Sequence, residues 1–207
     1  MRVSMGASLR LNTVAPPDEA KRPAPVLPGD VGFWTFIAAD AMLFLLLFLQ
    51  FSLDRTTQHA LFDEGQRALL PSLAAANTLI LVTSSFTVAL AVAATFRGDT
   101  RRIVRLMVVT STLGVAFAIL KIVEYVLEIG SGHTLSTNAF FMYYFLITGI
   151  HLLHLLVGVI GLSVIAFRLR VGGAADRNQV VLECGASYWH LIDVLWMFIF
   201  PLLYLAR

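Results

Sequence analysis

The sequence predicts an all-α integral membrane protein whose five transmembrane helices form one bundle. Hydrophobic residues make up 58 % of the 207 positions and charged residues 14 %, against roughly 45–50 % and about 25 % in soluble domains. The apolar residues gather in five stretches, each long enough to cross a bilayer as a helix of about 20 residues. These observations exclude a soluble enzyme domain and a disordered chain.

Residues 1–30 are polar and proline-rich, and we expect them to form a mobile N-terminal tail before a five-helix domain over 31–207. Five of the seven prolines lie in the tail, together with four basic residues. The tail has too little apolar surface to order itself. It also has no apolar run of roughly 7–15 residues such as a secretory signal peptide contains.

The five apolar stretches are expected at 31–53, 72–96, 103–128, 139–167 and 185–205. In lipid the backbone polar groups must be satisfied within the segment, so each stretch is predicted to be a helix. The alternating segments of about ten residues that mark a membrane β-barrel are not found in the sequence.

The positions of the basic residues predict the orientation in the membrane. Eleven lysines and arginines lie before the first stretch, between the second stretch and the start of the third, with Arg105 just inside it, and between the fourth and fifth, while three lie on the opposite side. By the positive-inside rule the N-terminus is cytoplasmic and the C-terminus is outside. This distribution follows from topology and gives no indication of nucleic-acid binding. The sequence also has no Walker loop, GxGxxG or HExxH motif.

Several charged residues lie within the apolar stretches, where charge is costly and often functional. Lys121 and Glu124 are three residues apart, so they share a helix face and can pair. We favour a self-neutralising pair near the outer end of the helix, with the lysine reaching outward. A carboxylate in a proton path is the alternative. Asp40 and Asp193 are further intramembrane carboxylates, and Glu183 lies at the cytoplasmic end of the fifth stretch.

His151 and His154 also lie three residues apart. Histidine is a common metal and haem ligand, but adjacent turns of one helix cannot supply the two opposite axial ligands of one haem. A metal site would need a third ligand, for which His190 or Glu124 could be recruited. We favour hydrogen bonds from these histidines to Glu or Asp of other helices and expect no metal site. The single cysteine, Cys184, excludes an internal disulfide and a Cys-based metal site.

Aromatic, polar and small residues add detail to the predicted bundle. Trp189 and Trp196 lie seven residues apart, which suits either a membrane interface or packing against a partner protein. Asn77 and the serines and threonines after it make the second stretch unusually polar, so we expect it to face the bundle interior or a partner. Small residues permit close helix approach; those in the fourth stretch are Gly149, Gly158 and Gly161.

Four motifs, in order over about residues 30–207, resemble those of haem-copper oxidase subunit III. One is the run Thr148-Gly149-Ile150-His151-Leu152-Leu153-His154, followed by Gly158. The others are Asn77-Thr78 with Ser84-Ser85 and Thr87, Gly114 with Phe117 and Glu124-Tyr125, and Glu183 with Tyr188-Trp189-His190, Asp193 and Trp196. A lone pair of histidines is a weak signal, whereas four motifs on five predicted helices are a strong one.

The resemblance implies a non-catalytic subunit of a respiratory oxidase in the bacterial cytoplasmic membrane. Such a subunit stabilises catalytic subunit I, beside subunit II, and binds phospholipids. Haem and copper are expected in the partner catalytic subunit, with no cofactor in this chain, and the electron donor is cytochrome c or a quinol. The proton-related or lipid-cleft candidates are Glu124, Lys121, Asp40 and Asp193. The structural polar candidates are His151, His154, His190, Glu183 and Asn77.

The chain departs from the family pattern at Ala39-Asp40, where the family usually has Ser-Glu, and at Lys121, where many oxidase members have a neutral residue. Lys121 with Glu124, the run 140–144 and the ending 200–205 resemble a subgroup associated with nitric oxide reductases. An accessory subunit of a nitric oxide reductase is therefore a second hypothesis. A small transporter, or a haem-binding anchor that uses the histidines, is the third.

Overall fold

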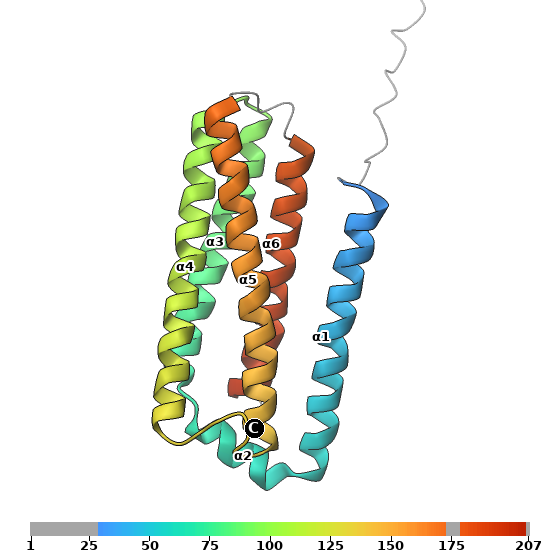
Figure 1. Cartoon of the computed structure of the whole chain (residues 1–207), viewed down its shortest axis with the longest axis vertical. Helices are drawn as coiled ribbons and strands as arrows, with labels where there is room; N and C mark the ends of the chain where they lie inside the picture. Colours follow the sequence, from blue (N-terminus) through green and yellow to red (C-terminus); the bar gives the residue numbers. More distant parts are fainter. Residues whose placement is uncertain (1–28, 173–178, 206–207) are drawn as a thin grey trace, which may run out of the picture.

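The computed structural model describes residues 29–172 and 179–205, which form a bundle of long helices (Figure 1). The helices are α1 (Val31–Thr57), α2 (His59–Ala68), α3 (Pro71–Thr95), α4 (Thr100–Gly130), α5 (Ala139–Gly172) and α6 (Gln179–Phe200), followed by the π-helical turn η2 (Pro201–Leu205). Strands do not occur among the described residues. Residues 1–28 of the predicted tail lie outside the described part of the chain.

Within the described residues, five helices, with α6 and η2 taken together as one, are long and apolar enough to cross a membrane. This confirms the predicted fold class. Four of the helices are longer than the predicted stretches, because apolar composition marks only the part of a helix that lies in lipid. Helix α1 ends at Thr57, α4 spans Thr100–Gly130, α5 ends at Gly172 and α6 begins at Gln179. The added turn of α4 is capped by Asp99, whose side chain accepts a hydrogen bond from the backbone N–H of Arg102 at 3.0 Å.

The short helix α2 is absent from the sequence-based prediction, because its ten residues mix polar and apolar side chains and cannot span a membrane. Its buried face holds Phe62, Gly65 and Gln66. Any Cβ at Gly65 would overlap the Phe140 ring of α5. Gln66 Nε2 donates to the carbonyl oxygen of Leu202 at 3.1 Å. Helix α2 therefore closes one end of the bundle against α5 and η2.

The four helices α3 to α6 pack together, and α1 lies at their edge (Figure 1). The largest contact joins α3 and α4; α5 packs against α4, and α6 packs against α3 and α5. Helix α1 has fewer contacts, which it makes with α2, α5 and α6. Because α1 has little packing to hold it, hydrogen bonds between α1 and its neighbours contribute more to its position than such bonds do for a central helix.

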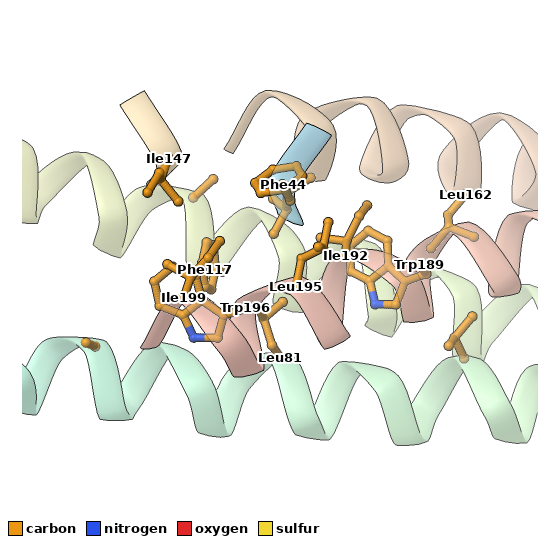
Figure 2. Close-up of a cluster of buried hydrophobic side chains, with 14 of the residues drawn as sticks. Phe44, Leu81, Phe117, Ile147, Leu162, Trp189, Ile192, Leu195, Trp196 and Ile199 are labelled. Atoms are coloured by element: carbon orange, nitrogen blue, oxygen red, sulfur yellow. The ribbon is translucent and has the colours of Figure 1, made fainter. Parts of the chain in front are cut away.

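The core is built around Trp189 and Trp196 of α6, both fully buried (Figure 2). Their indole N–H groups donate to Ser84 Oγ at 3.1 Å and Thr78 Oγ1 at 3.0 Å, both on α3. The prediction that these tryptophans mark a membrane interface or pack on a partner is wrong, because both lie inside the chain. The predicted interior position of the polar face of α3 is confirmed at Ser84 and Asn77, which are fully buried.

Glycines set how closely the helices approach Trp189. A Cβ at Gly114 of α4 would lie 2.6 Å from the Trp189 ring, and one at Gly158 of α5 would lie 3.0 Å from it. The close approach predicted for Gly158 is thus confirmed. The same prediction is wrong for Gly161, where an added Cβ would meet nothing within 4 Å.

Candidate functional site

Four buried polar side chains join α4, α5 and η2. Lys121 Nζ donates to Glu124 Oε2 at 3.1 Å and to the hydroxyl oxygens of Tyr204 at 2.7 Å and Tyr144 at 3.3 Å. The same two hydroxyl groups donate to Glu124 Oε1, at 2.5 Å from Tyr204 and 2.9 Å from Tyr144. Lys121, Glu124 and Tyr144 are fully buried, and Tyr204 is 3 % exposed. These four residues form what we term the Lys121 cluster.

Aromatic rings enclose the lysine ammonium group. Nζ lies 4.6 Å from the ring centroid of Tyr144 and 5.6 Å from that of Trp196, within the range of cation–π attraction. A buried ion pair is tolerated when further hydrogen bonds satisfy its remaining donors and acceptors, and the two tyrosines do this here. The cluster therefore joins α4, α5 and η2, and its buried donors and acceptors all have hydrogen-bond partners.

The π-helical turn brings Tyr204 into the Lys121 cluster. Helix α6 ends at Phe200 and the π turn begins at Pro201, a residue without the N–H that an α-helix would use. Inside this turn Leu203 and Tyr204 are buried. Short π segments often occur at functional positions, and here the turn supplies a hydroxyl group to a buried ion pair.

The predicted pairing of Lys121 with Glu124 is confirmed, but the predicted position of the lysine is wrong. Lys121 does not reach outward, because its side chain has no exposed surface. The ammonium is held inside the bundle by Tyr144 and Tyr204, which replace the water it would otherwise seek. One turn further along α4, the buried Glu128 contacts His133 Nδ1 at 2.9 Å.

Asp40 of α1 and His154 of α5 form a second polar pair. His154 Nε2 lies 2.9 Å from Asp40 Oδ1, and His154 Nδ1 lies 2.7 Å from the backbone oxygen of Ile150. Asp40 is 6 % exposed. The hydrogen bond predicted between a histidine and an acidic residue of another helix is therefore confirmed for His154. It ties the edge helix α1 to the rest of the bundle.

A third polar group lies between α3 and α6. Ser85 Oγ lies 2.8 Å from His190 Nδ1, and Asp193 Oδ2 lies 3.9 Å from the same nitrogen. The three side chains line a groove of about 540 Å³ whose other walls are largely apolar. Glu183 lies nearer the start of α6, where its Oε1 accepts from Gln179 Nε2 at 2.9 Å.

His151 is fully buried, and neither ring nitrogen has a hydrogen-bond partner among the described residues. Its ring packs against Phe117 and Trp196, with centroid distances of 5.7 and 5.2 Å. The interhelical hydrogen bond predicted for His151 is therefore wrong, and the imidazole acts as an aromatic core residue. The amide of Asn77 likewise lacks a partner within the described segments.

The predicted site residues do not include Tyr144, Tyr204, Tyr143 or Asp54, all of which make polar contacts between helices. Tyr144 and Tyr204 lie 23 and 83 positions after Lys121, and nothing in this spacing links them to it. The hydroxyl of Tyr143 donates to Asp54 Oδ2 at 2.5 Å, which joins α5 to α1. Asp54 lies just beyond the predicted end of the first stretch, so recognition of the longer helix would have revealed this contact.

The structure does not bring together the third ligand that a metal at His151 and His154 would need. Over residues 29–172 and 179–205, no group of three or more His, Cys, Asp or Glu side chains is placed to hold a metal ion. The polar side chains instead form pairs and small groups that join neighbouring helices.

The fold and these pairs define a multi-pass helical membrane protein whose intramembrane charged side chains contact neighbouring helices. The family model for cytochrome c oxidase subunit III matches residues 25–206, and the chain belongs to that family. It is 33 % identical over 177 residues to quinol oxidase subunit 3 of Bacillus subtilis, which covers 84 % of this chain and 85 % of the relative.

Other relatives carry related names. Cytochrome c oxidase subunit 3 of Synechocystis is 31 % identical over 176 residues, or 84 % of this chain and 74 % of the relative. Cytochrome bo(3) ubiquinol oxidase subunit 3 of Pseudomonas aeruginosa is 28 % identical over 176 residues, or 84 % and 83 %. With its five apolar helices and these bacterial relatives, the chain is a multi-pass protein of the bacterial cytoplasmic membrane.

Proposed function

We propose that this chain is the non-catalytic subunit III of a respiratory haem-copper oxidase. The observation that carries the proposal is the family match over residues 25–206, which includes all five apolar helices. Relatives aligned over most of the chain are named as the third subunits of quinol and cytochrome c oxidases. The role proposed for the chain is to stabilise the catalytic subunit and to bind lipid.

The Lys121 cluster supports a structural role for Lys121 and Glu124. A proton path needs groups that reach water or a partner group in succession, whereas Lys121 and Glu124 are enclosed and satisfied by two tyrosines. We propose that this pair fixes α4, α5 and η2 relative to one another. Asp40 and Asp193 lie nearer the surface of the bundle, at the edge helix and in the α3–α6 groove, and remain the proton-related or lipid-facing candidates.

The expected partners follow from the family. Haem and copper belong to the catalytic subunit I, which is accompanied by subunit II, and either cytochrome c or a quinol donates the electrons. The basic residues of the α3–α4 connection and of the C-terminal end of α5 lie at the same end of the bundle (Figure 1). This supports a cytoplasmic position for that end and an outer position for α2 and η2.

One observation favours a second candidate, an accessory subunit of a nitric oxide reductase. The three features that resemble the associated subgroup are the Lys121–Glu124 pair, the run 140–144 and the ending 200–205. They meet in one place, because Tyr144 and Tyr204 both contact the ion pair. The oxygen or nitric oxide chemistry of the partner decides between the two candidates.

The test is a purification of the native complex in mild detergent through a tag on this chain. The optical spectrum, mass spectrometry of the bound proteins, and the rates of oxygen and nitric oxide consumption are then measured. A haem-copper catalytic subunit with oxygen consumption is the expected result. A nitric oxide reductase core establishes the second candidate instead.

A preparation of the chain alone decides the third hypothesis. If the chain purifies without a haem protein and shows a Soret band of its own, it is a haem-binding anchor and the subunit proposal fails. If it purifies alone and colourless from membranes that keep oxidase activity, association with the oxidase is refuted, and transport has to be assayed.

A further inference from the structure

The groove between α3 and α6 presents an imidazole at its surface. His190 lines this groove with Ser85 and Asp193, and 42 % of the His190 side chain is exposed. Leu81 and Trp196, both buried, form the inner wall (Figure 2). The outer edges are exposed apolar side chains, namely Val82, Phe86, Val194 and Met197. Three polar side chains are thus set in an apolar surface.

A second cavity extends the groove along α6. It has a volume of about 290 Å³ and shares Ala89 and His190 with the part of about 540 Å³. The two are therefore continuous parts of one α3–α6 groove. Sites for small ligands have volumes of roughly 300–1,000 Å³, so the groove has room for an aromatic ring and part of a hydrocarbon chain.

The polar side chains of the groove lie about halfway along both helices. Ser85 is fourteen positions after the start of α3 and ten before its end, and Asp193 is fourteen after the start of α6 and twelve before the end of η2. At about 1.5 Å per residue, both lie about 15 Å or more from either helix end. Phospholipid headgroups lie at the surface of a hydrocarbon core of about 30 Å and do not reach this depth. Because lipid chains offer no hydrogen bonds, a partner for these side chains has to dissolve in the hydrocarbon.

The second ring nitrogen of His190 is a hydrogen-bond acceptor. His190 Nδ1 lies 2.8 Å from Ser85 Oγ and 3.9 Å from Asp193 Oδ2. Both of these oxygens can accept, so Nδ1 of the neutral ring carries the hydrogen. Nε2 is then left with a lone pair, and it has no partner within the described segments. A ligand of this groove should therefore have an O–H donor.

Asp193 has a buried carboxyl group that no neighbour satisfies. The residue is 7 % exposed, and neither carboxyl oxygen has a hydrogen-bond partner among the described residues. A buried polar group without a partner costs free energy, and such groups often have a functional reason. The position of Asp193 beside Nδ1 provides one, because an acceptor there keeps the hydrogen on Nδ1 and leaves Nε2 free to accept.

We propose that the α3–α6 groove binds an isoprenoid quinol, one of whose hydroxyl groups donates to His190 Nε2. A quinol is neutral and dissolves in hydrocarbon, and its hydroxyl groups donate as the phenol of tyrosine does. The isoprenoid chain leaves the groove past Phe86 and Met197. His190 contacts the quinol, and Ser85 and Asp193 are positioning residues. The inference rests on the membrane location of the chain and does not assign the electron donor of the oxidase.

The test uses the full-length chain, purified with the proteins that accompany it in mild detergent. Oxygen is excluded and any haem is reduced beforehand, so that the quinol stays reduced. The probe is decylubiquinol, and its dimethyl ether has the same ring and chain without the hydroxyl donors. Native mass spectrometry measures the Kd and the number bound for each. The quinol should bind about 10- to 100-fold more tightly, because the ether leaves the acceptor unpaired.

Substitutions separate the contact residue from the positioning residue. His190→Phe keeps a ring and removes Nε2, so it should weaken quinol binding by about 10- to 100-fold and leave the Kd of the ether nearly unchanged. Asp193→Leu allows the hydrogen to move to Nε2, so the ratio of the two Kd values should approach one. Its thermal midpoint should not fall, because an unpaired buried carboxyl group is replaced by an apolar side chain. A merely structural role for Asp193 would lower the midpoint and leave the ratio unchanged.

A matched pair on α3 tests the position of the ligand. Ala89→Leu adds bulk where the two parts of the groove meet. It should weaken binding of the quinol and of the ether alike, by about 5- to 100-fold. Ala93→Leu, one turn further along α3, adds the same bulk at an exposed position that does not line the groove, and it should change neither Kd. This pair decides the proposal even where His190→Phe does not fold.

Equal affinity for the quinol and its ether, or equal effects of Ala89→Leu and Ala93→Leu, overturns the proposal. So does a His190→Phe variant that releases an accompanying protein while quinol binding is unchanged, because the groove then receives a helix of a partner. The haem spectrum of the same preparations reports on the proposed function separately. A preparation without a haem protein overturns the oxidase assignment, and the comparison of Kd values still decides the quinol site.

Discussion

His154 hydrogen-bonds Asp40 through Nε2 at 2.9 Å while its Nδ1 lies 2.7 Å from the backbone oxygen of Ile150. A carbonyl oxygen can only accept, so Nδ1 carries a hydrogen. The contact between Nε2 and Oδ1 then needs one further proton, on either the ring or the carboxyl group. In both arrangements the pair has no net charge, so Asp40 is not a bare carboxylate in the membrane.

This arrangement predicts different results for two substitutions at position 40. Asp40→Asn keeps a donor for Nε2, because the amide NH₂ can donate to the ring, and it should change the free energy of unfolding by less than about 0.5 kcal/mol. Asp40→Leu removes the bond between α1 and α5 and should cost about 0.6–1.7 kcal/mol. Reversible unfolding of the purified chain in detergent micelles measures both values.

The control for position 40 is Glu64→Gln, an exposed residue of α2, which should leave stability unchanged. If Asp40→Asn and Asp40→Leu destabilise the chain equally, the bond to His154 is not what holds α1.

The Lys121 cluster predicts strong coupling between its two charged residues. Lys121→Met leaves Glu124 as an uncompensated buried charge and should cost about 3–5 kcal/mol. The double variant Lys121→Met with Glu124→Gln removes both charges and leaves an acceptor for the two tyrosines, so it should recover most of this loss. A double-mutant cycle on the unfolding free energy in detergent gives the coupling.

Independent effects at Lys121 and Glu124, with losses that add, would contradict the ion pair. Tyr204→Phe gives a smaller loss of about 1–3 kcal/mol, because one hydroxyl bond to each charged group disappears.

Gly114 should not tolerate a side chain. Gly114→Ala places a methyl group 2.6 Å from the Trp189 ring, so α4 and α6 must separate, and overpacking of this kind costs about 1–3 kcal/mol. The tryptophan fluorescence spectrum and the thermal midpoint report the change. Gly161→Ala is the matched control: it lies on α5 facing open space and should be neutral or slightly stabilising.

The predicted orientation can be tested with the native cysteine replaced. In a Cys184→Ala background, Ser136→Cys lies between α4 and α5 and Arg97→Cys lies between α3 and α4. A membrane-impermeant maleimide added to intact cells should label position 136, whereas position 97 should react after the membrane is permeabilised. The reverse pattern would invert the topology and place the α3–α4 connection outside.

The sequence predicted the five membrane helices because their length and hydropathy are set by the bilayer itself. It also predicted the Lys121–Glu124 pair, since spacing along one helix determines which side chains can meet. Helix α2 was not predicted, because a ten-residue amphipathic helix depends on its docking to α5 and η2. Composition does not reveal that docking.

Contacts between side chains of different helices could not be predicted from the sequence. The hydroxyl groups of Tyr144 and Tyr204 reach Lys121 from elements 23 and 83 positions away, and the second does so through a π turn that a 3.6-residue period does not describe. His151 shows the opposite error: its motif suggested a hydrogen bond, whereas its surroundings in the described structure are the rings of Phe117 and Trp196.

The place of Tyr204 in the chain has a consequence for biosynthesis. It follows Glu124 by 80 residues, and a ribosome adding about 5–20 residues per second needs about 4 to 16 s to cover that interval. Helix α4 therefore enters the membrane with neither hydroxyl bridge in place. Helix α5 adds that of Tyr144, and the ion pair still lacks the Tyr204 hydroxyl until the last transmembrane segment follows. Insertion of α6 and its π turn completes the cluster, so nascent chains halted before that point should be substrates for membrane quality-control proteases.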